Sequence, residues 1–244
     1  MAINVNTVYQ TVLYILNKEQ RGYIPPAEFN SLGTQVQLEI FEKYFEDLNQ
    51  QLRVPQTDDT YASRVENIDE KISIFKTFGN AVYDNTSTPG QQYFTLPTTD
   101  IYGTIVSFYR LGEVIYKDIT EVQRLQRNDF YNIQKSKLTK ATEDFPVYLY
   151  ENNKLFIQPA TITSNIVVDY VRKPADINWA FTVGTLGQYI NNEQASVNFE
   201  LHESEQTEVI LKILQYSGII IRDPQIVQAA GQQIQKEEIN QKSL

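Results

Sequence analysis

The sequence predicts an α+β protein in which a helical bundle from the N- and C-terminal segments carries an inserted antiparallel β-domain. Apolar residues recur at helical spacing near both ends of the chain, whereas the middle alternates apolar and polar residues between turn-forming Asn, Gly and Pro. The order is helices, strands and then helices, which favours segregated helical and β regions. We place one helical domain over residues 1–79 and 198–244, and a β-rich domain over residues 80–197.

Three helices are expected in the N-terminal segment. Asn4 or Asn6 can cap the first helix, because a short polar side chain there accepts a hydrogen bond from a free backbone amide. Pro26 suits the first position of the second helix, which continues along an uninterrupted apolar stripe. The expected ranges of the three helices are 5–21, 26–51 and 63–75.

The clearest β signal is a hairpin with an Asn-Asn turn, flanked on each side by alternating apolar and polar residues. A second tight turn is expected at residues 111–113, and a short helix is expected to interrupt the strands near residues 121–133. Residues 182–190 are compatible with either an extended segment or a loop. The expected strands are 93–96, 104–111, 114–116, 147–150, 155–158 and 166–172.

Helical patterning returns in the C-terminal segment. Asn198 is a candidate cap for a helix over residues 199–217, and Gly218 is a candidate stop. Asp223 followed by Pro224 is a start signal for a last, Gln-rich helix that reaches about residue 241.

Composition narrows the function classes. The 244-residue chain has a formal net charge of −9 and no cysteine. Wrapping DNA requires clustered Lys and Arg, so a transcription factor or nucleoid protein is disfavoured, whereas a channel through which DNA slides is compatible with the charge. No signal peptide is recognisable, and no apolar run approaches the ~20 residues of a membrane span. We therefore expect a protein that is soluble and intracellular at synthesis.

Residues suited to catalysis are sparse. His202 is the single histidine and cannot by itself build a usual zinc site, and no nucleophile elbow or phosphate-binding glycine motif is present. Glu203, Glu205 and Glu208 favour the positive end of the following helix, although a metal or acid/base cluster remains open. We expect no enzyme, no cofactor and no metal ion.

One segment opposes the acidic character of the chain. It spans residues 124–140 and surrounds Phe130 and Tyr131 with five cations. An ordinary charged helix with its exit loop explains this pattern, but so does a basic loop that contacts DNA phosphates or an acidic neighbouring subunit. The candidate contact residues are Arg124, Arg127, Lys135, Lys137 and Lys140.

The arrangement resembles phage head–tail connector proteins, the ring or adaptor proteins below the portal, especially those of crAss-like phages and other podoviruses. The resemblance covers most of the chain as an order of elements rather than as one diagnostic motif. The strings that carry it are GYIPPAEFN (22–30), YFTLP (93–97), FPVY (145–148), NKLFIQP (153–159) and DYVRKPAD (169–176).

This resemblance implies a non-enzymatic virion protein that forms a closed, dodecameric ring in the head–tail connector or upper tail. Genomic DNA would pass through the lumen without sequence readout. The implied partners are further copies of the chain, the portal protein and neighbouring tail rings, after synthesis and assembly in the host cytoplasm. The candidate interface residues are Tyr170, Arg172, Trp179, Gln228, Gln232 and Gln235.

Two other classes remain open at this stage. The aromatic-rich β-region is also compatible with a receptor- or glycan-binding tail-associated module. A hydrolase whose carboxylates escape recognition, such as one that acts on cell-wall glycan, is the third class.

Overall fold

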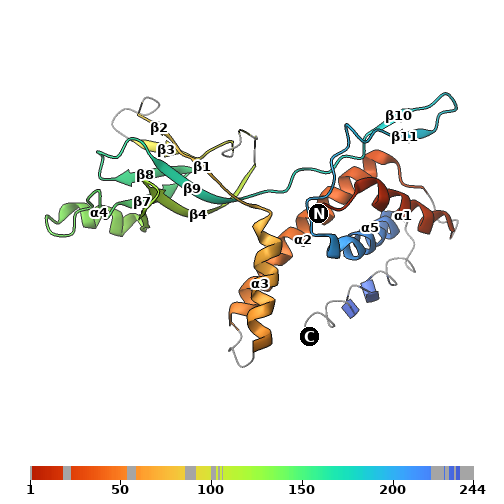
Figure 1. Ribbon diagram of the computed structural model, residues 1–244, viewed down its shortest axis with the longest axis horizontal. Coiled ribbons are helices and arrows are strands. Elements are labelled where there is room, and N and C mark those ends of the chain that lie inside the picture. Colours follow the sequence, from red (N-terminus) through yellow and green to blue (C-terminus); the bar gives the residue numbers. More distant parts are fainter. Residues whose placement is uncertain are drawn as a thin grey trace. The chain divides into compact units, whose positions relative to one another are not determined.

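The chain forms two compact units in the computed structural model. One unit comprises residues 1–74 and 174–244, and the other comprises residues 75–173. In the first unit the N-terminal helices pack against a C-terminal helix, and antiparallel sheets are inserted between these segments (Figure 1), which confirms the predicted α+β class. The structure describes residues 2–18, 23–53, 59–85, 92–99, 103, 105, 107–220, 228, 231–233, 235 and 236.

The unit boundaries differ from those drawn on the sequence, because residues 174–197 belong to the helical unit. Ile177 and Trp179 are buried there, and Asn30 of the second helix donates to the side chain of Asn178 at 3.0 Å. The segment therefore leaves the β-unit immediately after its last strand, and the division falls at 173/174 rather than at 197/198. At the other boundary the division falls at 74/75 rather than at 79/80.

The helical unit has a core built from one face of each packed helix. Phe29, Val36 and Ile40 lie on one stripe of the long second helix and are fully buried. Phe199 and Val209 close the core from the C-terminal segment. The elements are α1 (Val5–Lys18), α2 (Pro26–Arg53), α3 (Asp59–Ser73), the 3₁₀-helix η1 (Glu203–Glu205), α5 (Gln206–Ile220), β10 (Phe181–Val183) and β11 (Tyr189–Asn191).

The helix ends show which capping predictions hold. Asn4 caps α1, since its side chain accepts from the amides of Asn6 and Thr7, and Pro26 is the first residue of α2, as predicted. The prediction that Asn198 caps a helix starting at residue 199 is wrong, because α5 begins at Gln206 after η1. The helix also continues past Gly218 to Ile220, so Gly218 is not its stop.

The C-terminal helix is described only at a few positions. Residues 228, 231–233, 235 and 236 are helical, in agreement with the prediction for this segment. The predicted start signal at Asp223 and Pro224 lies outside the described residues, as does the predicted end of the first helix near residue 21.

An aromatic ladder connects the β10–β11 ribbon to the helical core. The ring of Tyr9 lies 4.6 Å from Phe29 and 4.4 Å from Trp179, which stacks on Phe181 at 5.8 Å. Phe181 in turn makes an edge contact with Tyr189 at 4.6 Å. A two-stranded ribbon is marginal in water by itself, so this ladder supplies packing that the two strands lack.

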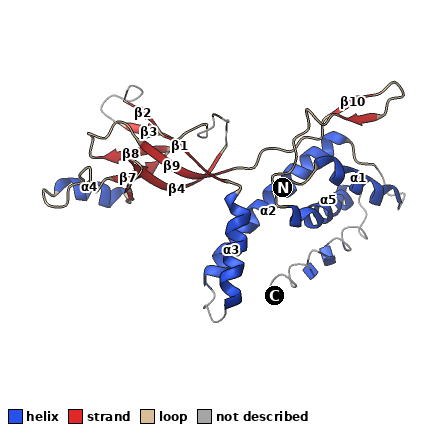
Figure 2. Ribbon diagram, in the orientation of Figure 1, coloured by secondary structure: helices blue, strands red, loops and turns tan. Residues whose placement is uncertain are grey.

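The inserted unit contains two sheets (Figure 2). Their side chains form one core. Val114, Val168 and Tyr170 come from the four-stranded sheet, and Phe94 and Leu155 come from the five-stranded sheet. The strand orders are β1-β9-β4-β5 and β2-β3-β8-β7-β6. The elements are β1 (Lys76–Asn80), β2 (Val82–Asp84), β3 (Tyr93–Thr95), β4 (Phe108–Tyr116), β5 (Thr120–Glu121), β6 (Gln123–Arg124), α4 (Arg127–Lys135), β7 (Val147–Glu151), β8 (Lys154–Gln158) and β9 (Ile166–Arg172).

The predicted hairpin is present as β7 and β8. Asn152 and Asn153 have φ of 50° and 56°, the left-handed geometry of a type I′ turn. The strand predicted at residues 166–172 is also present, but it pairs with β1 and β4 rather than with the hairpin.

Two predictions in the β-region are wrong. Residues 111–113 do not form a hairpin turn, since they lie within the single strand β4, whose register against β9 shifts between Leu111 and Val114. The helix expected near residues 121–133 begins at Arg127 instead, because Gln123 and Arg124 pair in parallel with Val147 and Tyr148 of β7. A parallel pair between distant residues leaves no local sequence signal.

Candidate interaction surface

Helix α4 is fixed to the five-stranded sheet by one aromatic anchor. Phe130 is 4% exposed and packs in a cluster with Ala141, Val147 and Leu149. Asp129 in the first turn and Lys135 in the last turn complement the helix dipole. Phe130 is the buried residue of this helix, whereas Asp129, Tyr131 and Lys135 are exposed.

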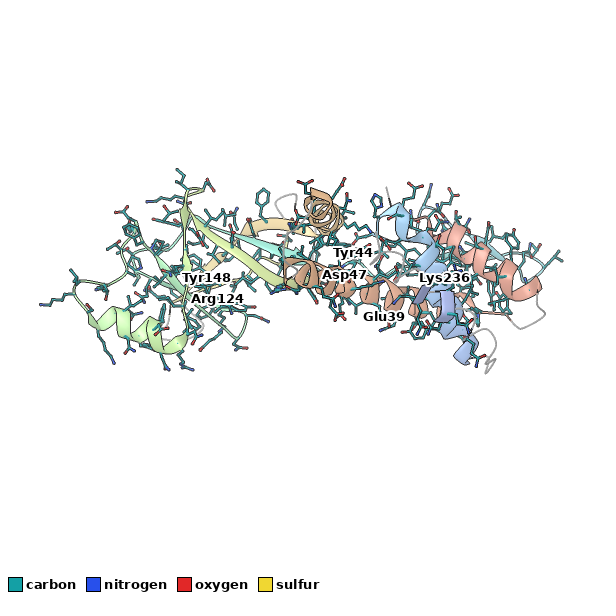
Figure 3. All side chains as sticks on the ribbon, turned by 90° about the horizontal axis from the view of Figure 1, so that it is seen from below. Glu39, Tyr44, Asp47, Arg124, Tyr148 and Lys236 are labelled. Carbon is teal, nitrogen blue, oxygen red and sulfur yellow. The ribbon has the colours of Figure 1, made fainter. Side chains whose placement is uncertain are left out.

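The five predicted basic residues are all exposed, but their environments differ. The guanidinium carbon of Arg124 lies 5.6 Å from the ring centroid of Tyr150, and Arg127 Nη1 lies 3.6 Å from Glu151 Oε2. Burial raises the pKa of Tyr148, and the positive charge of Arg124 beside it (Figure 3) offsets part of that increase. These two arginines are therefore already engaged with the sheet.

The three lysines make no such contacts. Lys135, Lys137 and Lys140 have no ion-pair partner among the residues that the structure describes. Because all three side chains are exposed, their ammonium groups are solvated in the isolated subunit. They differ in this respect from Arg124 and Arg127, although the sequence suggested one common role for all five.

The loop after α4 exposes large apolar side chains next to the lysines. Ser136 Oγ accepts hydrogen bonds from the amides of Leu138 and Thr139, each at 3.3 Å, and this turn directs the loop away from the helix. Leu138 is 94% exposed and Phe145 is 79% exposed. Both line an open groove of ≈ 600 Å³ whose other walls include Ile133 and Lys140.

We call Arg124, α4 and residues 136–146 the α4 surface. Sequence reasoning found its cations but missed Leu138 and Phe145. A leucine between two lysines in a stretch without apolar periodicity was the available signal, because such a residue has no expected core position.

Two of the three carboxylates that the sequence offered as a metal or acid/base cluster, Glu205 and Glu208, instead form ion pairs with lysines. Glu205 is buried and forms an ion pair with Lys71 of α3, while buried Glu208 pairs with Lys43 of α2 at 3.1 Å. Glu203 is exposed. In the described part of the chain, no group of three or more acidic or histidine residues is placed to hold a metal ion.

These ion pairs join three helices of the helical unit. Lys212 of α5 binds Glu39 of α2 at 3.2 Å, and Tyr216 donates a hydrogen bond to the same carboxylate. Burial raises the pKa of Tyr44, and the nearby charge of Glu205 raises it further; Figure 3 labels Tyr44 and Glu39 on α2. The network therefore has a structural explanation, since it joins α2 to α5 and α3 to η1.

His202 is an exposed capping residue. Its Nδ1 accepts from the amide of Ser204 at 3.2 Å and lies 2.9 Å from Ser204 Oγ, at the start of η1. The imidazole thereby satisfies a free backbone donor at a helix start.

The predicted interface residues fall into three groups. Tyr170 and Trp179 are buried and take part in the cores of their own units, while Arg172 is half-buried with its guanidinium carbon 5.7 Å from the Phe75 ring. The remaining three lie exposed on the described helical positions of the C-terminal segment, and they are Gln228, Gln232 and Gln235.

The sequence matches no protein-family model and no curated protein. Among the described residues, no helix is long and apolar enough to cross a membrane.

Proposed function

We propose that this chain is a non-enzymatic structural subunit of a phage virion that forms a dodecameric ring in the head–tail connector or upper tail. The observation that carries the proposal is the exposure of large apolar side chains on both units. Leu186 at the tip of the β10–β11 ribbon is 90% exposed, Leu138 is 94% exposed, and Ile119 is 90% exposed. On the α4 surface Leu138 and Phe145 line one groove, and an apolar patch of this kind is typical of a surface that a partner covers.

The arrangement of elements supports a ring more than another assembly. Exposed apolar side chains occur on both units, among them Leu186 on the ribbon of the helical unit and Leu138 on the α4 surface of the β-unit. A subunit of a cyclic ring needs two different faces, because each copy contacts one neighbour with one face and the next neighbour with the other. The resemblance to connector proteins adds the location below the portal and a lumen for genomic DNA.

The partners of this ring are copies of the same chain, the portal protein and adjacent tail rings. With a net charge of −9, the subunits do not attract DNA through their overall field, which suits passage without sequence readout. The ring would be synthesised and assembled in the host cytoplasm and would remain in the virion.

Cryo-electron microscopy of assembled particles, with symmetry determination around the tail axis, tests the proposal. Density for twelve copies as a closed ring between portal and tail is the expected result. Density at a peripheral appendage would favour the receptor- or glycan-binding module instead. Absence of the chain from particles would overturn the structural role.

A further inference from the structure

We infer that the α4 surface binds the acidic face of α2 and α3 on a second copy of this chain. The inference rests on the proposed ring, in which each subunit meets its neighbour through two different faces. It assigns those faces to one surface on the β-unit and another on the helical unit.

Charge is segregated between the two units. The helical unit contains ten Lys and Arg residues against twenty Asp and Glu, whereas the β-unit contains eleven against ten. The acidic excess of the chain therefore belongs to the helical unit. A basic surface on the β-unit and an acidic surface on the helical unit are complementary between copies, and such complementarity sets register and speeds association.

The acidic face is formed by two pairs of carboxylates at helical spacing. Glu42 and Glu46 are four residues apart on α2, and Glu66 and Glu70 are four residues apart on α3, so each pair shares one side of its helix. All four are exposed and have no ion-pair partner among the described residues. Like charges at this spacing repel, and a cationic partner would relieve that repulsion.

The α4 surface has the composition of a protein-binding site rather than a DNA-binding site. Leu138 and Phe145 are exposed and line one groove, and Lys140 lines the same groove. Apolar residues at the centre with charges at the rim are typical of protein–protein interfaces.

Nucleic acid is a poorer fit for three reasons. Two of the five cations already contact the sheet, the carboxylates of Glu143 and Asp144 lie within the same surface, and three lysines neutralise few phosphates. Neutralisation of phosphates by Lys and Arg supplies much of the affinity for duplex DNA, so few available cations predict weak binding. The structure therefore favours an acidic protein face over DNA, a choice that the sequence left open.

Disulfide trapping tests the contact, because the natural chain has no cysteine. Thr139→Cys places one thiol on the α4 surface beside Lys140, and Ser73→Cys places another on the helix side of Glu66 and Glu70. The two full-length variants are mixed at high concentration under mild oxidation. The expected product is the mixed disulfide dimer, in clear excess over the dimer of Ser73→Cys with Thr163→Cys, an exposed loop position of the β-unit.

Charge reversal gives the discriminating control. Reversing Lys135, Lys137 and Lys140 to Glu should lower the yield of the mixed dimer about tenfold, since several rim ion pairs are replaced by repulsion. Introducing Glu66→Lys and Glu70→Lys in the partner chain should restore the yield. A comparison of single charge reversals completes the control. Lys137→Glu should lower the yield of the mixed dimer, whereas Arg110→Glu should leave it unchanged, because Arg110 is an exposed residue of β4 outside the α4 surface.

Several outcomes would overturn the contact. They are a yield equal to the Thr163→Cys control, insensitivity to charge reversal, or charge-dependent retention of a duplex DNA fragment without dimer formation. A closed ring in particles combined with failed trapping would leave the proposed function standing and reject only this interface. Successful trapping without a closed ring in particles would support this contact and reject the proposed function.

Discussion

The side-chain oxygen of Asn198 accepts a hydrogen bond from the backbone amide of Val5 at 3.0 Å, so the first helix is capped from a position 193 residues away. Asn4 caps the same helix locally, and Ile3 pairs with Phe199 in an adjacent β-bridge. The two ends of the helical unit are therefore joined by backbone and side-chain contacts at one place. This relationship explains how segments separated by the entire β-unit form one core.

Replacing Asn198 with Ala should lower the free energy of unfolding of the helical unit by about 1 kcal/mol, the usual loss for a helix cap. Asn198→Asp keeps the acceptor oxygen and adds a negative charge at a helix N-terminus, so it should retain most of the stability. Urea unfolding followed by circular dichroism measures both. Equal stability of Asn198→Ala and the natural chain would show that the contact contributes nothing.

Gly112 permits the register shift in β4, because a Cβ atom there would lie 2.9 Å from the backbone oxygen of Asp169 on the neighbouring strand. Gly112→Ala should therefore cost about 1–3 kcal/mol, since the clash is with backbone that cannot move independently. Gly231→Ala is a comparison without a steric clash, since its added Cβ meets nothing within 4 Å, and at this helical position the change should stabilise by up to about 1 kcal/mol. Circular dichroism is the suitable probe, and a neutral effect at Gly112 would contradict the close approach of the strands.

The sequence signals that succeeded were local ones. The Asn152-Asn153 turn needs only its own two residues to fix the hairpin, and the alternation of residues 166–172 identifies β9 without knowledge of its neighbours. The signals that failed depend on distant partners. Gly112 suggested a turn because a β-bulge and a turn share the same local composition. Asn198 suggested the start of a helix at residue 199, whereas its side-chain oxygen accepts a hydrogen bond from the first residue of α1.

The same distinction holds for the α4 surface. The cations could be recognised from composition alone, whereas the exposure of Leu138 and Phe145 depends on which apolar residues the sheet covers. The burial of Tyr170 and Trp179 likewise depends on the fold, since both interface candidates lie in the cores of their own units.

The buried carboxylate of Glu208 should make stability depend on pH. Burial raises its pKa in the folded state, and the ammonium of Lys43 opposes only part of that increase. The folded state therefore binds a proton more readily than the unfolded state, so this contribution to stability is fully present below about pH 4.5 and is lost as the pH rises through the folded-state pKa.

The comparison with Glu208→Gln isolates this effect. The stability of the natural chain relative to Glu208→Gln should be most favourable near pH 4 and should decrease toward neutral pH. Urea unfolding across that range measures the difference, and Glu193→Gln, which removes an exposed carboxylate from the same unit, gives the baseline. A difference that does not change with pH, or that grows as the pH rises, would contradict the assignment.

Trp179 provides a reporter for the helical unit alone, because it is the only Trp in the chain and lies 4% exposed within that unit. Its Nε1 donates to Asn6 Oδ1 at 3.0 Å. Asn6→Ala should leave this buried donor unpaired and lower the free energy of unfolding by about 1–3 kcal/mol, even though Ala is the better helix former. Asn6→Asp preserves the acceptor and should be much less destabilising.

Unfolding followed by Trp fluorescence should show the loss of stability for Asn6→Ala. The midpoint of the same fluorescence transition should not shift for Gly112→Ala, whose change lies in the other unit. A matching fluorescence shift for both variants would show that the two units unfold as one.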